Sequence, residues 1–208
     1  EFIRRVDVQS ETIERYVRDG MILPDLVIPM SEHRSFKYFK EETLERYTQE
    51  FGWKLIDDNN RKTLFMEMVE QMDMSYSYKP VLLKAVLQYA DKQGRVKIED
   101  IVAYFKAYYE DRRTKGLKVE KQNSIFAKGG YTDKEAERNI LSNPFKRFED
   151  MNMMRHTKTL GIVEVDSSVW KKLSEEEKEH ILSVCDKKLG EYYARIKEFH
   201  KMTGVFDK

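Results

Sequence analysis

The sequence predicts a mainly α-helical fold, a helical bundle whose centre contains a short β-hairpin. Three observations predict it. Apolar residues recur at helical spacing over most of the chain. Only nine of the 208 residues are Gly and four are Pro, so few positions interrupt a helix. Turn-forming residues separate the periodic stretches, and two short stretches on either side of residue 160 alternate as strands do.

Composition limits the classes of protein to which this chain can belong. Hydrophobic residues make up 40% and charged residues 36% of the chain, which is typical of a folded protein of one or two domains. The single cysteine, Cys185, excludes an intrachain disulfide and a multi-cysteine zinc site. No apolar run is long enough to span a membrane, and the first residues are too polar for a signal peptide. We therefore expect no membrane contact, a cytoplasmic location and, because the chain starts at Glu1, a piece of a larger protein.

Residues 1–74 are expected to form a small helical subdomain. The stretch 11–16 recurs at 42–47 with one conservative change, and each copy predicts a helix that ends at a glycine. The match indicates either an internal duplication or shared helical composition. Residues 21–30 contain two prolines and are expected to run as an extended apolar connector. Asn60 is a good N-cap for a third helix.

Residues 75–208 are expected to form a second, winged-helix-like domain that ends in a long helix. A buried helix begins near Pro80, because Pro fits a first helical turn and the residues after it are apolar on nearly every side. A short strand is expected at Arg95–Ile98, where apolar and charged residues alternate. Glu99 then opens an amphipathic helix.

A third helix, a hairpin and the long final helix complete this domain. A capping box at its start predicts a helix over 132–151, which Asn143 and Pro144 restart. Alternating residues predict a hairpin with strands at 153–157 and 162–165. An apolar stripe predicts one long helix over 175–199.

The order of these elements is that of a winged helix-turn-helix. In such a module the helix before the hairpin is presented to the major groove, and the hairpin lies against the phosphate backbone or minor groove. The candidate contacts on that helix and hairpin are Lys134, Arg138, Lys146, Arg147, Arg155, His156 and Lys158, the last three at or near the tip of the hairpin. Winged helices also bind proteins, so a partner-binding role stays open.

The positive charge is concentrated in the middle of the chain. Residues 71–131 hold 12 Lys and Arg against 7 Asp and Glu, whereas residues 1–70 hold 11 against 15. A basic loop at 112–128 is expected to contact phosphates, because Lys and Arg displace counterions from a nucleic-acid backbone. Its basic residues are Arg112, Arg113, Lys115, Lys118, Lys121 and Lys128. A solvated insertion loop would have the same composition, so both interpretations stay open.

Enzyme signatures are absent from the sequence. It contains no GxxxxGK[ST], GxGxxG, HExxH or GxSxG pattern, so we expect no catalytic residue and no cofactor. The four histidines are dispersed, and we expect no metal site. Glu164 and Asp166 alternate on a predicted strand as nuclease carboxylates do, but two serines follow where such a site needs a lysine.

Two runs carry a resemblance to a known family. MSYSYKPVLL at 74–83 and NILSNPFKRFEDM at 139–151 resemble the C-terminal accessory region of bacterial DEAD/DEAH-box superfamily 2 helicases that are related to restriction-enzyme motor subunits. The first run also resembles a segment ahead of the catalytic domain in some HNH-type restriction endonucleases. The likeness covers residues 74–170 best. It implies that the motor, with its ATP and Mg, lies outside this sequence, since no motor motif occurs in it.

We therefore predict a noncatalytic nucleic-acid-binding or regulatory C-terminal region of an ATP-dependent DNA helicase. Its expected partners are DNA and the helicase motor domains. The alternative is a protein-protein interaction module in which the long final helix and the acidic first subdomain dock onto a helicase or restriction-system subunit.

Overall fold

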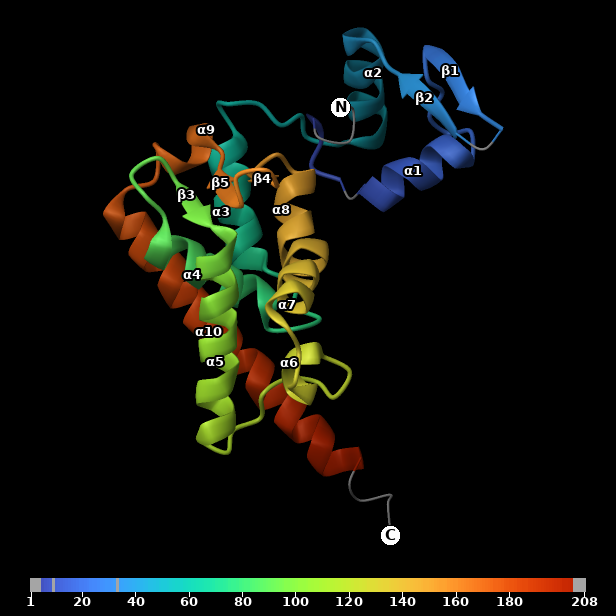
Figure 1. The fold of residues 1–208 in the computed structure, drawn as a ribbon. Coiled ribbons are helices and arrows are strands. Elements are labelled where there is room, and N and C mark those ends of the chain that lie inside the picture. The colour runs from blue at the N-terminus through green and yellow to red at the C-terminus, as the bar shows by residue number, and fades with distance from the viewer. Residues whose placement is uncertain (1–4, 9, 33, 204–208) are drawn as a thin grey trace.

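The computed structural model describes residues 5–8, 10–32 and 34–203, with side chains as far as Ile196. The fold is mainly helical and contains two small antiparallel sheets, one of two strands and one of three. Figure 1 shows a larger body around the three-stranded sheet and a smaller N-terminal unit beside one end of it. Among the described residues, no helix is both long and apolar enough to cross a membrane.

The N-terminal unit contains both helices that were predicted there, together with a hairpin that was not. Its elements are α1 (Ser10–Arg18), β1 (Leu26–Ser31), β2 (Arg34–Tyr38) and α2 (Glu41–Phe51). The predicted connector is extended from Leu26 onward, but it pairs with the residues that follow it. Gly52 ends α2 with a φ of 66°, a left-handed conformation that favours glycine, and its N–H donates to the carbonyls of Thr48 and Gln49.

Helix α3 (Arg61–Gln71) packs into the larger body. The ring centroids of Phe65 and Phe148 are 6.3 Å apart, and Leu64 and Val69 are buried in the same cluster. A separate cluster in the N-terminal unit is formed by Val6, Ile13, Ile22, Leu44 and Tyr47. The buried side chains thus divide after Leu55, whereas the domain boundary predicted from the sequence lies at residue 74.

The centre of the larger body follows the predicted order of helices and strands. Its first part is α4 (Tyr78–Tyr89), β3 (Arg95–Lys97) and α5 (Ile98–Thr114), and its hairpin is β4 (Met154–Thr157) with β5 (Ile162–Val165). The strand β3 pairs with β5, so the antiparallel sheet has the order β3-β5-β4. In this register Arg95, Glu164 and Arg155 lie opposite one another.

The helix predicted over 132–151, with a restart at Asn143-Pro144, consists of three segments, α7 (Asp133–Ile140), the π-helical η2 (Leu141–Phe145) and α8 (Lys146–Asp150). The capping box is confirmed, since Glu135 N–H donates to Thr132 Oγ1 at 3.3 Å and Thr132 N–H donates to Glu135 Oε2 at 2.8 Å. The π-helical segment contains Pro144, which has no backbone N–H. Because proline cannot donate the regular α-helical hydrogen bond, the chain forms a wider turn at this position.

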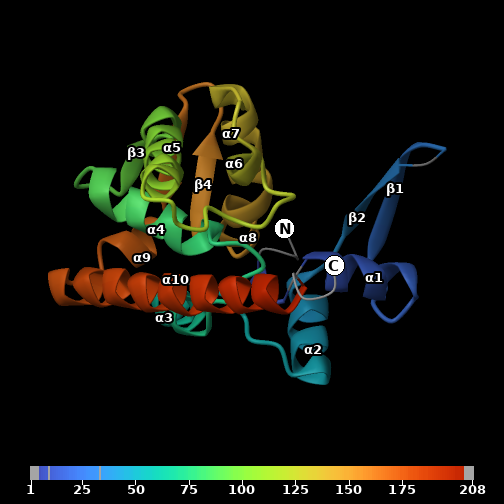
Figure 2. The ribbon, with the colours of Figure 1, turned by 90° about the horizontal axis from the view of Figure 1, so that it is seen from below.

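Helix α10 (Glu175–Thr203) is the predicted long helix. Its capping box is also confirmed, because Ser174 N–H donates to Glu177 Oε2 at 2.8 Å. A short helix that was not predicted, α9 (Ser167–Trp170), precedes it. Figure 2 shows α10 along one side of the body, with α5 and α7 on the opposite side.

Candidate nucleic-acid interface

The hairpin places its three predicted contact residues in different environments. Arg155 and His156 lie within β4, and Lys158 opens the turn between β4 and β5. The guanidinium of Arg155 is 3.3 Å from the Glu164 carboxylate across the strands. His156 points to the other face, where its ring centroid is 6.3 Å from that of Phe145. Only Lys158 is therefore at the tip, and its side chain makes no ion pair with any described residue.

Two cations that the sequence analysis missed share the outer face of this sheet with Arg155. Arg95 and Lys97 alternate on β3, and Arg95 lies opposite Glu164, so their side chains emerge on the same face. Each has a carboxylate nearby, Asp91 at 2.9 Å for Arg95 and Glu99 at 3.3 Å for Lys97. This face of the sheet therefore carries three cations, and each of them has a carboxylate within 3.3 Å that compensates its charge. These cations come together only because β3 pairs with the hairpin, and no local pattern in the sequence predicts that pairing.

The basic stretch 112–128 is not a loop over its whole length. Arg112 and Arg113 lie in the last turn of α5, and Lys128 ends the short helix α6 (Ile125–Lys128). The prediction of a loop is wrong for these three residues. The helix continues because Arg112 and Arg113 make tertiary contacts that stabilise its end.

Those contacts use both guanidinium groups structurally. Arg112 Nε donates to the Lys118 carbonyl at 2.8 Å, and its guanidinium lies 3.3 Å from the centre of the Tyr193 ring on α10. Arg113 Nη2 donates to the Phe126 carbonyl at 2.8 Å, and Nη1 pairs with Glu110. Residues 115–124 connect α5 to α6 and are called the connecting segment below. Arg112 holds this segment near its start, and Arg113 holds the helix α6 at the end of the segment.

A buried carboxylate fixes the middle of that segment. Glu120 is 1% exposed and accepts hydrogen bonds from the N–H and hydroxyl of Ser77, at the start of α4, and from the hydroxyl of Tyr192 on α10. Burial, reinforced by the bond to Glu120, raises the pKa of Tyr192, so this hydroxyl remains a donor at neutral pH. Glu120 therefore ties the connecting segment to α10 and to the residue before α4, although no local pattern predicted an acidic anchor in a basic stretch.

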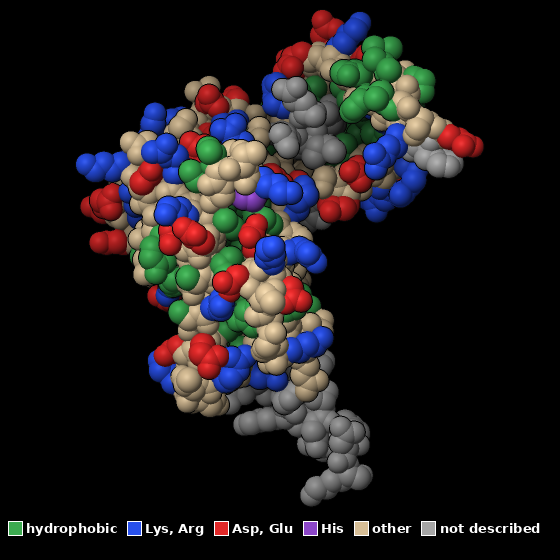
Figure 3. Space-filling view, in the orientation of Figure 1, with side chains coloured by type: hydrophobic (Ala, Val, Ile, Leu, Met, Phe, Trp, Pro, Cys, Tyr) green, Lys and Arg blue, Asp and Glu red, His purple; other side chains and the backbone are tan. Residues whose placement is uncertain are grey.

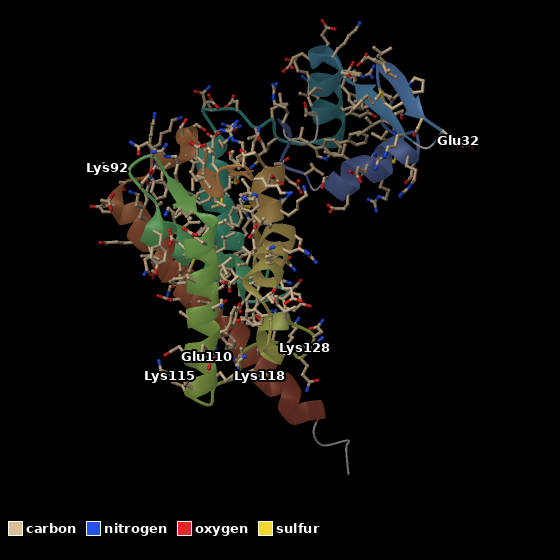
Figure 4. The ribbon with its side chains drawn as sticks, in the orientation of Figure 1. Glu32, Lys92, Glu110, Lys115, Lys118 and Lys128 are labelled. Atoms are coloured by element: carbon tan, nitrogen blue, oxygen red, sulfur yellow. The ribbon has the colours of Figure 1, made fainter. Side chains whose placement is uncertain are left out.

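The remaining lysines of the stretch stay at the surface. Lys115 pairs with Asp111 at 2.8 Å, and Lys121 lies 5.4 Å from the centre of the Tyr76 ring. Lys118 and Lys128 make no ion pair with any described residue. Figure 4 shows Lys115, Lys118 and Lys128 at the same end of the larger body.

The cations of the candidate recognition helix are also of two kinds, exposed ones without an ion pair and ones that are paired or half-buried. Lys134 and Arg138 are exposed on α7, and neither forms an ion pair with a described residue. Lys146 pairs with Asp150 on α8. Arg147 is half-buried where α8 meets the N-terminal unit, and burial lowers the pKa of its guanidinium while nearby carboxylates oppose that shift.

Glu164 and Asp166, the two carboxylates compared with nuclease residues, have partners within the fold. In the described ranges, no group of three or more His, Cys, Asp and Glu side chains could hold a metal ion. Asp166 instead accepts from the Ser168 N–H at 2.8 Å as the N-cap of α9, and Arg61 lies 3.1 Å away. Burial acts to raise the pKa of this carboxyl, but those partners outweigh it and hold the pKa below its usual value.

Cys185 occupies the packing position expected from the sequence. Its side chain is fully buried in the main core, and burial raises the pKa of the thiol to about 12. A thiol in this state is a poor nucleophile at neutral pH.

Comparisons with protein-family models, with curated proteins and with solved structures find no match to this chain. The arrangement and chemistry of its own residues are therefore the basis for a functional proposal.

Proposed function

We propose that this chain is a noncatalytic nucleic-acid-binding or regulatory C-terminal region of an ATP-dependent DNA helicase in the cytoplasm. The observation that carries the proposal is the three-stranded sheet, in which the strand between the first two helices pairs with the second strand of the hairpin. That arrangement is typical of a winged helix. The α7–α8 segment then takes the place of the recognition helix, and the β4–β5 hairpin takes the place of the wing.

The resemblance to helicase accessory regions adds support from the same part of the molecule. The run at 74–83 leads into α4 and supplies its first residues, and the run at 139–151 contains the end of α7, η2 and α8. Both runs are thus inside the proposed module. ATP and Mg are assigned to the motor of the parent protein, and no cofactor is proposed for this chain.

Surface cations with neither a carboxylate nor an aromatic partner are the proposed contacts with the phosphate backbone. Burial, ion pairing and the contact of Lys121 with the Tyr76 ring remove several of the residues predicted from sequence. The half-buried Lys118 and four exposed residues are left, namely Lys128, Lys134, Arg138 and Lys158. Figure 3 shows Lys and Arg side chains interspersed with Asp and Glu over the larger body, which favours weak binding over tight binding. Five backbone contacts predict that log affinity falls with log salt at a slope of about −4 to −5 on duplex DNA.

Fluorescence anisotropy with a labelled duplex tests this proposal. We expect the double variant Lys118→Glu, Lys128→Glu to weaken binding on every sequence alike and to reduce the salt slope by about 2, because backbone contacts carry no base information. The matched control is Lys187→Glu, which makes the same kind of charge change at an exposed site on α10. No binding at about 50 mM salt, or equal effects of the double variant and the control, contradicts nucleic-acid contact.

Arg112 and Arg113 are unsuitable for this test. Replacing either would remove a hydrogen bond to a backbone carbonyl and loosen the connecting segment. A loss of binding in such variants would report folding as well as contact.

A second candidate function is docking onto a helicase or restriction-system subunit. The observation that favours it is a set of exposed apolar side chains on the β1–β2 hairpin.

A further inference from the structure

The β1–β2 hairpin is exposed at every described position of both strands. The register places Leu26 opposite Tyr38 and Ile28 opposite Phe36, so these four apolar side chains share one face. Each of them is between 41% and 55% exposed. Figure 3 shows hydrophobic side chains gathered on the N-terminal unit, and Figure 2 shows the hairpin projecting away from the larger body. A contiguous apolar surface of this kind is typical of an interaction site.

A groove runs along β2 between the hairpin, α1 and α2, and Met30 and Ser31 at the end of β1 also reach it. Seven consecutive residues, 34–40, line it, and Ile13 and Val17 of α1 and Leu44 of α2 contribute apolar side chains to it. Consecutive residues of a strand point to opposite faces, so a groove that touches all of them follows the edge of the strand. Its volume is about 1470 Å³, above the roughly 300–1,000 Å³ of small-molecule sites. The groove has the shape for an extended chain.

The edge of β2 that faces this groove has no strand partner. Among the described residues, β1 is the only strand that pairs with β2. In a two-stranded ladder, alternate N–H and C=O groups of each strand point away from its partner. The groove therefore offers a row of backbone donors and acceptors, and an isolated hairpin gains stability when a third strand occupies them.

The charges around the groove favour an acidic occupant, because positive side chains outnumber negative ones in its lining, with Arg5, Arg18, Arg34, Lys37 and Lys40 against Glu14 and Glu41. Arg5 is already neutralised by Glu41 at 2.6 Å. Arg34 and Lys37 on β2 form no ion pair with any described residue, and both line the groove. Lys37 lies on the face opposite Phe36, so acidic side chains on that face of an incoming segment compensate it, and Arg34 at the start of β2 adds positive charge to the same groove.

We propose that the outer edge of β2 binds an extended, acidic segment of a partner protein, which adds to the hairpin as a third strand. A segment of about five to seven residues matches the length of β2 and the residues that follow it. Alternate apolar side chains of the segment pack beside Phe36 and Tyr38, and its acidic side chains on the other face lie beside Lys37. This docking does not depend on the nucleic-acid contact proposed above, because it uses none of the same residues.

Hydrogen exchange and anisotropy on the full chain test this site with a labelled peptide of sequence EVEIEVE. We expect the peptide to slow amide exchange within residues 34–38 by about tenfold or more, which is the signature of strand addition. The double variant Arg34→Glu, Lys37→Glu should weaken binding by about tenfold or more. Lys92→Glu, at an exposed lysine on the turn before β3, is the charge control and should change nothing (Figure 4). The peptide KVKIKVK should not bind.

A second pair of variants tests the contribution of apolar side chains to peptide binding. Phe36→Ala should weaken peptide binding, whereas Leu160→Ala, at an exposed site on the β4–β5 turn, should not. Both side chains are exposed, so neither change removes packing from a core.

Several results overturn the proposal. One is the absence of EVEIEVE binding, or binding without protection of residues 34–38. Another is equal binding of KVKIKVK, since charge selection would then be absent. If duplex DNA displaces the peptide and the Arg34→Glu, Lys37→Glu variant loses DNA affinity, the groove is a nucleic-acid surface instead. If the chain self-associates in sedimentation experiments and Phe36→Ala abolishes the association, the hairpin is an interface between copies.

Discussion

The N-terminal unit and the larger body differ in what covers their sheets. In the larger body, helices bury the inner face of the β3-β5-β4 sheet, where Val96, Val163 and Val165 are at most 3% exposed. In the N-terminal unit, both faces of the β1–β2 hairpin are exposed, and five buried hydrophobic side chains form the core among the residues that the structure describes. The comparison indicates that the larger body supplies its own packing, whereas the hairpin has apolar surface available for a partner.

Aromatic packing explains how the larger body buries its own apolar side chains without a partner. Phe126 is fully buried, and its ring lies 4.6 Å from that of Tyr109 and 5.4 Å from that of Tyr78, measured between centroids. These rings come from α6, α5 and α4, so one cluster joins three helices. The N-terminal unit has a smaller aromatic group, in which Trp53 packs 4.8 Å from Phe51.

The largest expected effect is the loss of that central ring. Phe126→Ala should destabilise the larger body by about 3–5 kcal/mol, because it removes buried area and leaves a cavity. Ile13→Ala should cost about 2–5 kcal/mol, but within the N-terminal unit, because Ile13 belongs to the separate cluster. The two tryptophans allow the regions to be followed separately in urea, Trp53 in a Trp170→Phe background and Trp170 in a Trp53→Phe background. If Ile13→Ala shifts both reporters equally, the regions unfold as one unit and the comparison fails.

Substitutions at two glycines compare the two regions with smaller expected losses of stability. Gly94 has a φ of 82°, and a Cβ placed on it would lie 2.6 Å from Cγ of Trp170, whereas Gly52 has a φ of 66° and open space around it. Gly52→Ala should therefore cost about 1 kcal/mol for backbone strain alone. Gly94→Ala should cost about 1–3 kcal/mol more, because the added methyl group overpacks the indole. Thermal unfolding measures both changes, and equal losses would show that the body accommodates the methyl group freely.

The smallest expected effect is on pH dependence. The backbone N–H of Lys40 and then the hydroxyl of Thr43 hold the pKa of Asp25 below 3.8, its ordinary value. Because this pKa is depressed in the folded state, Asp25 contributes its full stability above pH 3.8 and loses it as the pH falls through the folded-state value. Asp25→Asn should lower the stability of the N-terminal unit near neutral pH and flatten its decline in acid. Trp53 fluorescence measures this, and an unchanged acid profile would contradict the assignment.

Local features of the sequence determined most of the helices. The capping boxes at Thr132 and Ser174 formed as predicted, because their partners are three residues away and need no tertiary contact. Helix α3 starts after Asn60 as expected, although Asn60 does not cap it through its side chain. Its side chain instead closes the preceding turn by accepting from the Asp57 N–H.

The order of helices and strands in the larger body could likewise be predicted from alternation and turn signals. The candidate site could be predicted only as a set of basic residues. Sequence did not show which cations are free, because that depends on partners far along the chain, such as Tyr193 for Arg112 and Phe126 for Arg113.

Only the tertiary structure decided how these elements combine. The pairing of β3 with β5 joins residues nearly seventy positions apart, for example Arg95 with Glu164. The burial of Glu120 depends on Ser77, just before α4, and on Tyr192 of α10. Sequence periodicity reports which face of an element is apolar, but it does not report which other element covers that face, because the covering contacts form only when distant segments pack together.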